Sequence, residues 1–261
     1  MSEMTKRRPF LSLVWPLYKG IYLRADKIKA ISNFIAKEVR SLGYKKEVEI
    51  IPNAVDVAKF SAPVAEERIV ELKTRFGKKM GDVFLFTASR LVLSRGVEDT
   101  IRALQYLPEN VKLLIAGSGE DQDKLERIAH ETNVAERVIF AGHIGHDTLP
   151  ELYKISDIFV RPSIIEGFGN AFVEAFAAGI PVVATPVGGI PDFLTDGETG
   201  LFCEVRNPES IARAVEKYME NAMLVKQVVD NAKKLVAEKY DWNVIAHAMK
   251  ERIFEPLTRR G

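Results

Sequence analysis

From residue 82 onward, short runs of apolar residues alternate with longer stretches in which apolar residues recur at helical spacing. The short runs, such as VFLF and LLIA, are apolar at successive positions rather than at every second one. Strands that are apolar on both faces, each followed by a helix, are typical of a parallel sheet covered by helices on both sides. The sequence therefore predicts an α/β fold with a doubly wound, Rossmann-like parallel sheet.

The individual elements follow from the same pattern and from the glycines and prolines that interrupt it. Strands are predicted at 83–89, 111–116, 138–141, 157–162, 182–185 and 201–204. Helices are predicted at 97–107, 120–133, 148–155, 170–178 and, in several pieces, from 208 to about 257. The crossovers should be right-handed, and ligands should bind at the edge of the sheet where the carboxyl ends of its parallel strands lie.

The first 56 residues predict too few elements to close a sheet with a core of its own. They contain a helix at 10–24, a strand at 27–32, a helix at 34–42 and a strand at 48–51. Asn33 is the predicted N-cap of the second helix, and Gly43 is its predicted end. This partial α/β segment has the pattern of the last part of a domain.

Residues 57–81 are polar, and we interpret them as a linker that contains one charged helix at 66–75. The predicted organisation has four parts: an N-terminal segment at 1–56, the linker at 57–81, the sheet domain at 82–241, and a C-terminal helix at 242–261 that packs back on the N-terminal segment.

The composition excludes several classes of protein. The chain has 261 residues and a formal net charge of +1, so bulk electrostatics do not favour nucleic acid as a partner. Cys203 is the single cysteine, which excludes an internal disulfide and a multi-cysteine metal site. We therefore expect a protein of the reducing cytoplasm.

The N-terminal 23 residues raise the question of a membrane. Three basic residues at 6–8 precede an apolar stretch at 10–23, as in a signal peptide, but Pro16 and Lys19 interrupt that stretch and no clear cleavage site follows. The stretch is also too short and too polar to span a bilayer. Two interpretations stay open: a helix that packs on protein, and a peripheral contact with the cytoplasmic face of the membrane through Phe10, Leu11 and Trp15.

The stretch from Pro162 to Gly189 carries the strongest functional signal in the chain. It is a strand end, a glycine loop, a helix, a strand and a second glycine loop, and Glu166 and Glu174 bracket the first loop and the first helical turns. Glycines let a ligand approach the backbone closely. A helix that opens after such a loop presents free N–H groups and the positive end of its dipole, which favours a phosphate.

Two arginines strengthen the case for a phosphate. Arg90 follows the first strand of the sheet domain, and Arg95 lies just before Gly96. Two guanidinium groups suit a diphosphate, because each can fork onto phosphate oxygens and can offset charge on a departing phosphate. The loops that follow the strands should form one composite site, and they are Arg90–Gly96, Gly117–Asp121, Gly142–Asp147, Ser163–Gly169 and Pro186–Pro191.

Other chemistries fit the sequence less well. Gly117 and Gly119 suggest a dinucleotide-binding turn of a dehydrogenase, but Gln122 stands at the third glycine and no acidic residue ends the next strand. His143 and His146 lack the spacing and the further ligands of a metal site, so no metal is predicted. Paired carboxylates also occur in retaining glycosidases, but that class does not account for the arginines and the helix end.

Glu174 is expected inside a helix among apolar neighbours, where a carboxylate is costly unless it has partners. An ionised carboxylate accepts hydrogen bonds, and two vicinal hydroxyls of a ligand would supply them. The alternative is an ordinary surface residue of the helix.

At these residues the chain resembles the retaining glycosyltransferases of the GT-B architecture, specifically family 4. The matching motifs are DKIKAISNFIAKEV (26–39), EIIPNAVD (49–56), SRLVLSRG (89–96), IAGSGED (115–121), VIFAGHI (138–144), DIFVRPSIIEGFGNAFVEAFAAGIPVVATPVGGIPD (157–192) and TGLFCEV (199–205). The resemblance extends over nearly the whole chain from residue 20 on. Its most specific signal is the pair of glutamates, Glu166 and Glu174, that have seven residues between them and include the EGFG motif.

The resemblance implies transfer of a sugar from a UDP-, GDP- or ADP-sugar to a sugar or lipid-linked acceptor, with retention and without an obligatory metal. It implies that Arg90 and Arg95 bind the diphosphate, that Glu174 binds the ribose, and that Glu166 binds the donor sugar together with the backbone at Gly167, Phe168, Gly169 and Asn170. Gly117 and the loop of Gly142, His143 and Ile144 are the remaining expected ligand contacts, the latter beside the base.

The chain departs from the family pattern in three ways. Arg95 stands where a lysine is usual, and Ala54 stands where glycine is common. The family also has a complete first domain that binds the acceptor, of which residues 1–56 resemble only the end. We therefore expect a donor-binding half that is inactive alone, that pairs through residues 1–60 with a second copy or a partner subunit, or that acts as a non-catalytic nucleotide-sugar-binding module.

Overall fold

The computed structural model describes residues 19–258, and its larger part is built on a six-stranded parallel sheet. The strand order is β5–β4–β3–β6–β7–β8. The strands are β3 (Val83–Ala88), β4 (Val111–Ala116), β5 (Val138–Gly142), β6 (Ile158–Arg161), β7 (Val182–Ala184) and β8 (Leu201–Phe202). Two runs of strands grow outward from the β3–β6 pair in opposite directions, which confirms the predicted doubly wound α/β fold.

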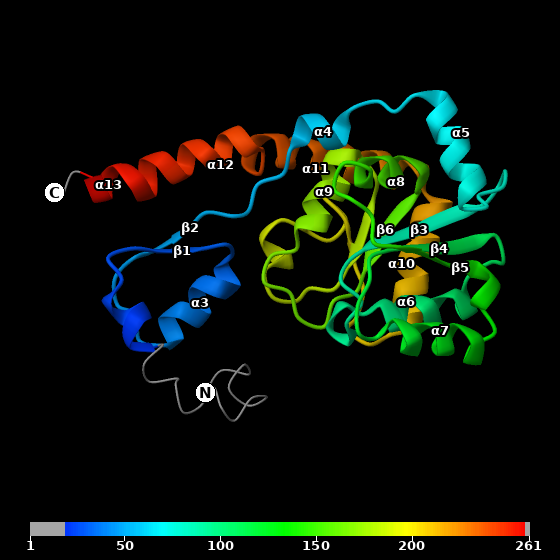
Figure 1. Cartoon of the computed structure of the whole chain (residues 1–261), viewed down its shortest axis with the longest axis horizontal. Coiled ribbons are helices and arrows are strands. Elements are labelled where there is room, and N and C mark those ends of the chain that lie inside the picture. Colours follow the sequence, from blue (N-terminus) through cyan, green and yellow to red (C-terminus); the bar gives the residue numbers. More distant parts are fainter. Residues whose placement is uncertain (1–18, 259–261) are drawn as a thin grey trace.

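Helices cover both faces of this sheet (Figure 1). The first face carries α4 (Val57–Ser61), α5 (Glu66–Arg75), α8 (Leu149–Ile155), α9 (Asn170–Ala178) and part of α11 (Ala222–Lys239). The second face carries α6 (Val97–Ala103), α7 (Gln122–Glu131) and α10 (Pro208–Glu220). Successive residues of β3 enter different cores, because Phe84 and Phe86 face the first set of helices and Leu85 faces the second. This arrangement explains why the strands have apolar residues at successive positions.

The helix α9 is buried almost all round. Every residue from Ala171 to Ala178 is buried, because α4, α8 and α11 surround the helix on the side away from the sheet. Such a helix has no solvated face, so any polar side chain in it must find partners inside the protein or in a ligand. The helix begins at the glycine loop that the sequence identified as a candidate anion site.

A smaller unit precedes the sheet domain. It contains a helical turn at 19–24, β1 (Ile28–Ala30), α3 (Asn33–Ser41) and β2 (Val48–Ile50), and β1 pairs with β2 in parallel. Ala36 and Val39 of α3 pack on Ala30 and Val48 to form a small core of its own. In the described part of residues 1–60, the large apolar side chains that stay exposed are Ile21, Tyr22 and Leu23.

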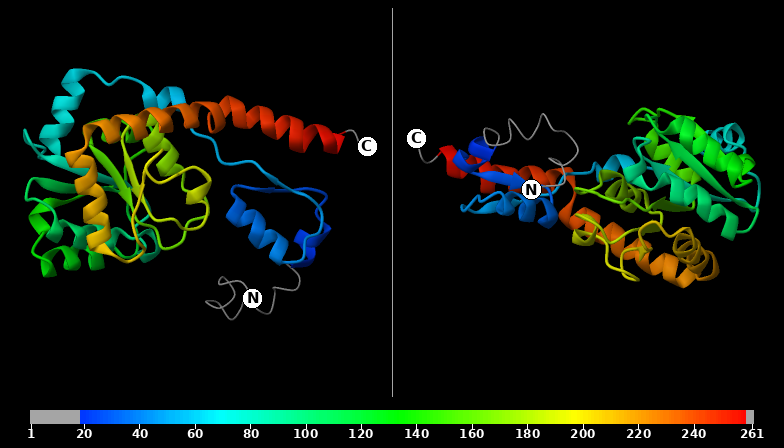
Figure 2. Two further views of the ribbon diagram at one scale, coloured as in Figure 1. Left: turned by 180° about the vertical axis from the view of Figure 1, so that it is seen from behind. Right: turned by 90° about the horizontal axis from the view of Figure 1, so that it is seen from below.

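The C-terminal helices return to this smaller unit, as two views show (Figure 1, Figure 2). They are α12 (Trp242–Met249), a π-helical turn (Lys250–Phe254) and α13 (Glu255–Thr258). Ile245 and Ile253 pack on Ile51. Arg252 donates two hydrogen bonds to the carboxylate of Glu49, of 3.0 and 2.6 Å. The C-terminal helices are therefore in direct contact with the segment around β2.

The structure differs from the predicted elements at several points. Ser32, not Asn33, caps α3, because the Ser32 hydroxyl accepts a 3.2 Å hydrogen bond from the N–H of Ile35. The helix predicted at 97–107 ends at Ala103 and continues as a 3₁₀ turn. The pattern missed α4, whose Phe60 belongs to the first core, so the predicted linker covers the sheet. The expected membrane contact at Phe10, Leu11 and Trp15 lies outside the described residues.

No helix within residues 19–258 has the length and apolar character that crossing a membrane requires.

The cap of α3 gives a prediction about stability. Ser32→Ala should lower the free energy of unfolding by about 1–2 kcal/mol, because it removes the cap and a 2.6 Å bond to the Gly167 carbonyl. Urea denaturation measures the change. Ser41→Ala removes an exposed hydroxyl from the same helix and should cost less than about 0.5 kcal/mol. A larger loss in Asn33→Ala than in Ser32→Ala would contradict the observed cap.

Candidate functional site

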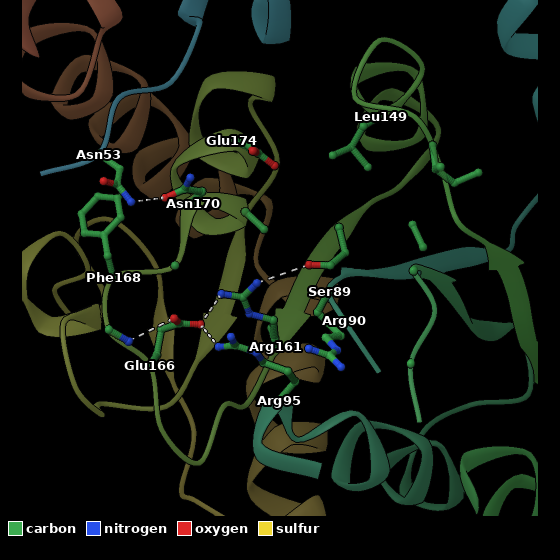
Figure 3. A pocket seen from close by; sticks show the side chains of 18 of the residues that line it. Asn53, Ser89, Arg90, Arg95, Leu149, Arg161, Glu166, Phe168, Asn170 and Glu174 are labelled. Carbon is green, nitrogen blue, oxygen red and sulfur yellow. Dashed lines mark hydrogen bonds and ion pairs between the residues drawn. The ribbon is translucent and has the colours of Figure 1, made fainter. Parts of the chain in front are cut away.

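A pocket of about 850 Å³ opens where the two halves of the sheet diverge. The loops after β3 and β6 enclose it, because these two central strands are followed by connections that run in opposite directions. Such a switch point at the carboxyl ends of parallel strands is where α/β sheets bind their ligands. Figure 3 shows the side chains that converge there.

Every site residue predicted from the sequence lines this pocket except Gly142. The lining includes Arg90, Arg95, Gly117, His143, Ile144, Glu166, Gly167, Phe168, Gly169, Asn170 and Glu174. Gly142 is half-buried, and its carbonyl accepts a 2.8 Å hydrogen bond from the N–H of Gly117, which does line the pocket. The loop Pro186–Pro191 also stays behind the pocket wall, and supports the wall through a 3.0 Å bond from the N–H of Gly189 to the Glu166 carbonyl.

The carboxylate of Glu166 lies between two guanidinium groups, as the converging dashed lines in Figure 3 show. Its Oε2 accepts a hydrogen bond of 2.5 Å from Nη1 of Arg95 and one of 2.7 Å from Nη2 of Arg161. Its Oε1 accepts a 3.1 Å bond from the N–H of Gly167. The side chain is buried, so these charge-assisted bonds replace its hydration.

Arg161 is the main site residue that the sequence reasoning missed. It is the last residue of β6, is 5% exposed, and donates from Nη1 to the Ala88 carbonyl at 3.3 Å. Its guanidinium also lies 4.2 Å from the ring centroid of Phe172. Burial lowers the pKa of Arg161, and the nearby Glu166 opposes that shift. A charged residue within an otherwise apolar strand was the available signal, since such a residue must have a partner.

Two glycines allow the backbone of this wall to pass close to its neighbours. Gly169 has a φ of 97°, and a side chain there would place its Cβ 2.5 Å from the Phe172 ring and 2.9 Å from Nη2 of Arg161. Gly188 has a φ of 57°, and a Cβ there would lie 1.7 Å from the Glu166 carbonyl. Other residues are excluded at both positions by backbone strain and by collision.

The N-terminus of α9 faces the pocket. Gly169 is its N-cap and supplies no side chain to bond the first N–H groups, and both Asn170 and Ala171 line the pocket. Free N–H groups and the helix dipole favour an anion at this end. The structure therefore places the start of α9, the candidate anion site, at the pocket.

Glu174 lies one helical turn further along α9, with its carboxylate at the pocket and the rest of its side chain buried. Its Oε2 accepts a 3.1 Å hydrogen bond from the hydroxyl of Tyr153, and Nε2 of His146 lies 3.9 Å from its Oε1. Burial raises the pKa of Glu174, and the Tyr153 hydroxyl, His146 and Arg161 partly oppose that rise. The buried Tyr153 on α8 was not predicted as a partner.

The smaller unit closes one side of the pocket. Ile31 and Asn53 line it, and Nδ2 of Asn53 donates a 3.0 Å hydrogen bond to Oδ1 of Asn170. The Ser32 hydroxyl donates to the Gly167 carbonyl at 2.6 Å, and the Asn33 N–H donates to Oδ2 of Asp192 at 2.7 Å. These contacts fix the glycine loop from the side opposite the sheet, and the sequence did not predict them.

Gly119 and His146, which the sequence raised as candidates for a dinucleotide or a metal site, make contacts within the protein. A Cβ on Gly119 would lie 2.2 Å from the Leu91 carbonyl, so this glycine serves a close approach of two loops. The side chain of His146 is within hydrogen-bond distance of Lys59, a cation, at 3.3 Å. In the described part of the chain, no group of histidine, cysteine, aspartate or glutamate side chains is arranged to hold a metal.

Comparison with known protein families decides among the alternatives. The profile of the glycosyl transferases group 1 family matches residues 69–235, which include the whole sheet from β3 to β8 and the pocket loops. The chain belongs to this family. A second profile, that of Glycosyltransferase Family 4, matches residues 3–59. Both matches agree with the resemblance seen in the sequence motifs.

Individual relatives are glycosyltransferases as well. An uncharacterized glycosyltransferase of Methanocaldococcus jannaschii is 34% identical over 224 residues, which cover 84% of this chain and 57% of that protein. A GDP-mannose-dependent alpha-(1-6)-phosphatidylinositol monomannoside mannosyltransferase of Mycobacterium tuberculosis is 27% identical, over 88% of this chain and 63% of that protein. The chain thus spans about three fifths of the length of these curated relatives.

Solved structures show the same fold. Anabaena HepE, solved in complex with UDP and glucose, superposes with a TM-score of 0.85 at 22% identity, over 92% of this chain and 66% of that one. At this identity the likeness establishes the fold, which is that of the GT-B glycosyltransferases. The relatives of this chain include a nucleotide-sugar-dependent glycosyltransferase. Membership of the group 1 family therefore does not favour the alternative of a binding module without activity.

The paired charges in the pocket give a prediction about stability. Glu166→Gln should lower the free energy of unfolding by about 3–5 kcal/mol, because it leaves the buried guanidinium of Arg161 without a counter-charge. Adding Arg161→Met to that variant should restore most of the loss, since no buried charge then remains unpaired. Urea denaturation of both variants checks this. Equal stabilities of the single and the double variant would contradict this prediction.

Proposed function

We propose that this chain binds a nucleotide-diphosphate sugar in the pocket between β3 and β6 and serves transfer of the sugar to a carbohydrate or lipid-linked acceptor. The observation that carries the proposal is the set of charges at one pocket: three arginines, a helix N-terminus and two carboxylates meet at the switch point of the sheet. Cations and free N–H groups suit the diphosphate, and carboxylates suit the hydroxyls on either side of it.

Arg90 and Arg95 are the proposed diphosphate ligands. Arg90 is exposed at the pocket and has no ion pair among the described residues, so its guanidinium is free to fork onto phosphate oxygens. Arg95 is part-exposed and can turn from Glu166 toward the same anion. Both cations offset the negative charge that grows on the nucleoside diphosphate as it leaves, which is stabilisation of the transition state.

The two carboxylates take the hydroxyl-bearing parts of the donor. Glu174 is proposed to accept hydrogen bonds from the two ribose hydroxyls, and Glu166 to accept from the donor sugar. The backbone at Gly167, Phe168, Gly169 and Asn170 lies beside Glu166 and would contact the same sugar. On the other side, Gly117, His143 and Ile144 would border the nucleotide, with Gly142 supporting that loop from behind.

We further propose that transfer retains the configuration at the anomeric carbon. The bond from that carbon to the phosphate oxygen breaks, and a bond to the acceptor oxygen forms on the same face. The leaving phosphate oxygen takes the proton of the acceptor hydroxyl, so atoms and charges balance without a metal. Arg90, Arg95 and Glu166 are the residues that would touch the reacting groups. Analysis of the anomeric configuration of the product by NMR tests this step.

The parts of the chain have different proposed roles. Residues 82–241 bind the donor, and residues 1–56 belong to the side that meets the acceptor, since Ile31 and Asn53 already border the pocket. The return of the C-terminal helices to Ile51 holds the two parts together. Residues 1–60 are also the proposed contact with a second copy, a partner subunit or the cytoplasmic face of a membrane.

Nucleotide binding is the first test. Isothermal titration calorimetry with UDP, GDP and ADP should show at least one ligand, because relatives differ in the base: HepE was solved with UDP and the mycobacterial relative is GDP-mannose-dependent. Arg90→Ala should lower the affinity for that ligand by about tenfold or more, because a charge-assisted contact is lost. Arg127→Ala removes an exposed arginine from α7, away from the pocket, and is the control. No binding of any of the three would reject the proposal.

The raised pKa of Glu174 predicts how nucleotide affinity depends on pH. The ionised carboxylate is the form that accepts from ribose hydroxyls, and burial raises its pKa in the free protein. Nucleotide affinity should therefore be highest at pH values above the pKa of Glu174 and should fall as the pH drops through that pKa. Because the pKa is raised, the fall should begin at a higher pH than for an ordinary glutamic acid. In the same titration series, Glu174→Gln should bind the nucleotide more weakly at high pH and should lack this fall in affinity as the pH drops. Identical pH profiles for the two proteins would remove Glu174 from the ribose site.

A further inference from the structure

We propose that Arg161 is a positioning residue that keeps the Glu166 carboxylate in place when Arg95 leaves it for the donor's diphosphate. Glu166 then turns a freed lone pair toward the donor sugar, so that the sugar contact is completed by binding of the diphosphate. This inference rests on the proposed function and adds to it the buried arginine that the family motifs did not indicate.

The two arginines on Glu166 are not equivalent. Both donate to the same oxygen, Oε2, but the side chain of Arg95 is 31% exposed and that of Arg161 is 6% exposed. Arg95 comes from a 3₁₀ turn in the loop after β3, whereas Arg161 ends a central strand of the sheet. Arg95 is therefore the partner that can move, and Arg161 is the partner that stays.

Further contacts fix the Arg161 guanidinium independently of Glu166. Its Nη1 donates to the Ala88 carbonyl at 3.3 Å, and its guanidinium carbon lies over the Phe172 ring, 4.2 Å from the centroid. A Cβ at Gly169 would lie 2.9 Å from its Nη2, so the glycine loop also passes close to this group. Strand, helix and loop therefore all surround the guanidinium, which faces Glu166.

The charge of the diphosphate explains why Arg95 would leave Glu166 for the ligand. In the free protein Glu166 is the anion nearest to Arg95. A diphosphate carries more charge and more acceptor oxygens, so it competes for the same guanidinium. When Arg95 leaves, the carboxylate loses one of three donors but keeps Arg161 and the Gly167 N–H, and it stays ionised and oriented. One acceptor position on Oε2 is then open to a sugar hydroxyl.

The inference predicts a loss specific to the sugar. Calorimetry is performed with whichever pair the protein binds: UDP and UDP-glucose, GDP and GDP-mannose, or ADP and ADP-glucose. The measured quantity is the affinity for the nucleotide sugar divided by the affinity for the nucleoside diphosphate. Arg161→Met should lower this ratio by about tenfold, because Glu166 loses its fixed partner. The loss of one positive charge weakens binding of the nucleotide sugar and of the nucleoside diphosphate by the same factor, and this factor cancels in the ratio.

Arg161→Lys provides a second variant that keeps the charge and fills most of the volume. An ammonium cannot reach Glu166 and the Ala88 carbonyl together as the forked guanidinium does, so the ratio should fall in this variant too, though less. If Arg161→Met does not fold, as judged by circular dichroism, the ratio in Arg161→Lys decides. An unchanged ratio there would overturn the inference.

Two controls separate the possible causes. Arg137 is the matched buried arginine, 7% exposed and bonded to the carbonyls of Val111, Leu107 and Pro108 away from the pocket. Arg137→Met should leave the ratio unchanged. Arg95→Gln should weaken the nucleoside diphosphate itself. If Arg161→Met weakened both ligands equally, the inference would fall and the proposed function would stand. If the unaltered protein bound none of the nucleoside diphosphates, the proposed function would fail first and the inference with it.

Discussion

The Glu166 carboxylate is a buried negative charge, and the structure around it is arranged to compensate that charge. Two guanidinium groups and a backbone N–H reach it, and they come from the loop after β3, the end of β6 and the glycine loop itself. An isolated carboxylate in this position would cost several kcal/mol or become protonated. The carboxylate thus joins the two central strands of the sheet at the point where the pocket opens.

The topology of the sheet explains why these groups meet. β3 and β6 are neighbours although a long stretch of sequence separates them, because the chain first builds outward through β4 and β5 and then returns. The connections after β3 and β6 leave in opposite directions and open a crevice between them. Arg90 and Arg95 stand on one side of the crevice, and Glu166 and the start of α9 stand on the other. The charges of the pocket are a consequence of this strand order.

The smaller N-terminal unit takes part in the same site. Ser32 serves α3 as its N-cap and at the same time donates to the Gly167 carbonyl, so the helix and the glycine loop depend on one hydroxyl. Asn53 reaches Asn170 at the start of α9. On the far side, α12 and the π-helical turn pack on Ile51, and Arg252 pairs with Glu49. The smaller unit therefore contacts the glycine loop and the start of α9 on one side and the C-terminal helices on the other.

The sequence by itself determined the local features of this protein. Apolar strands, helical spacing and glycine punctuation depend on near neighbours, so the sheet class, most element bounds, the glycine loop at 167–169 and the arginines at its rim could be predicted. The N-cap of α3 was misplaced by one residue, because Ser32 and Asn33 are both good caps and the choice depends on contacts with Gly167 and Asp192. Tertiary structure decided which groups become partners. Arg161 with Glu166, and Tyr153 with Glu174, meet only after strands and helices distant in sequence have packed, and burial then turns ordinary side chains into paired charges and bonded hydroxyls.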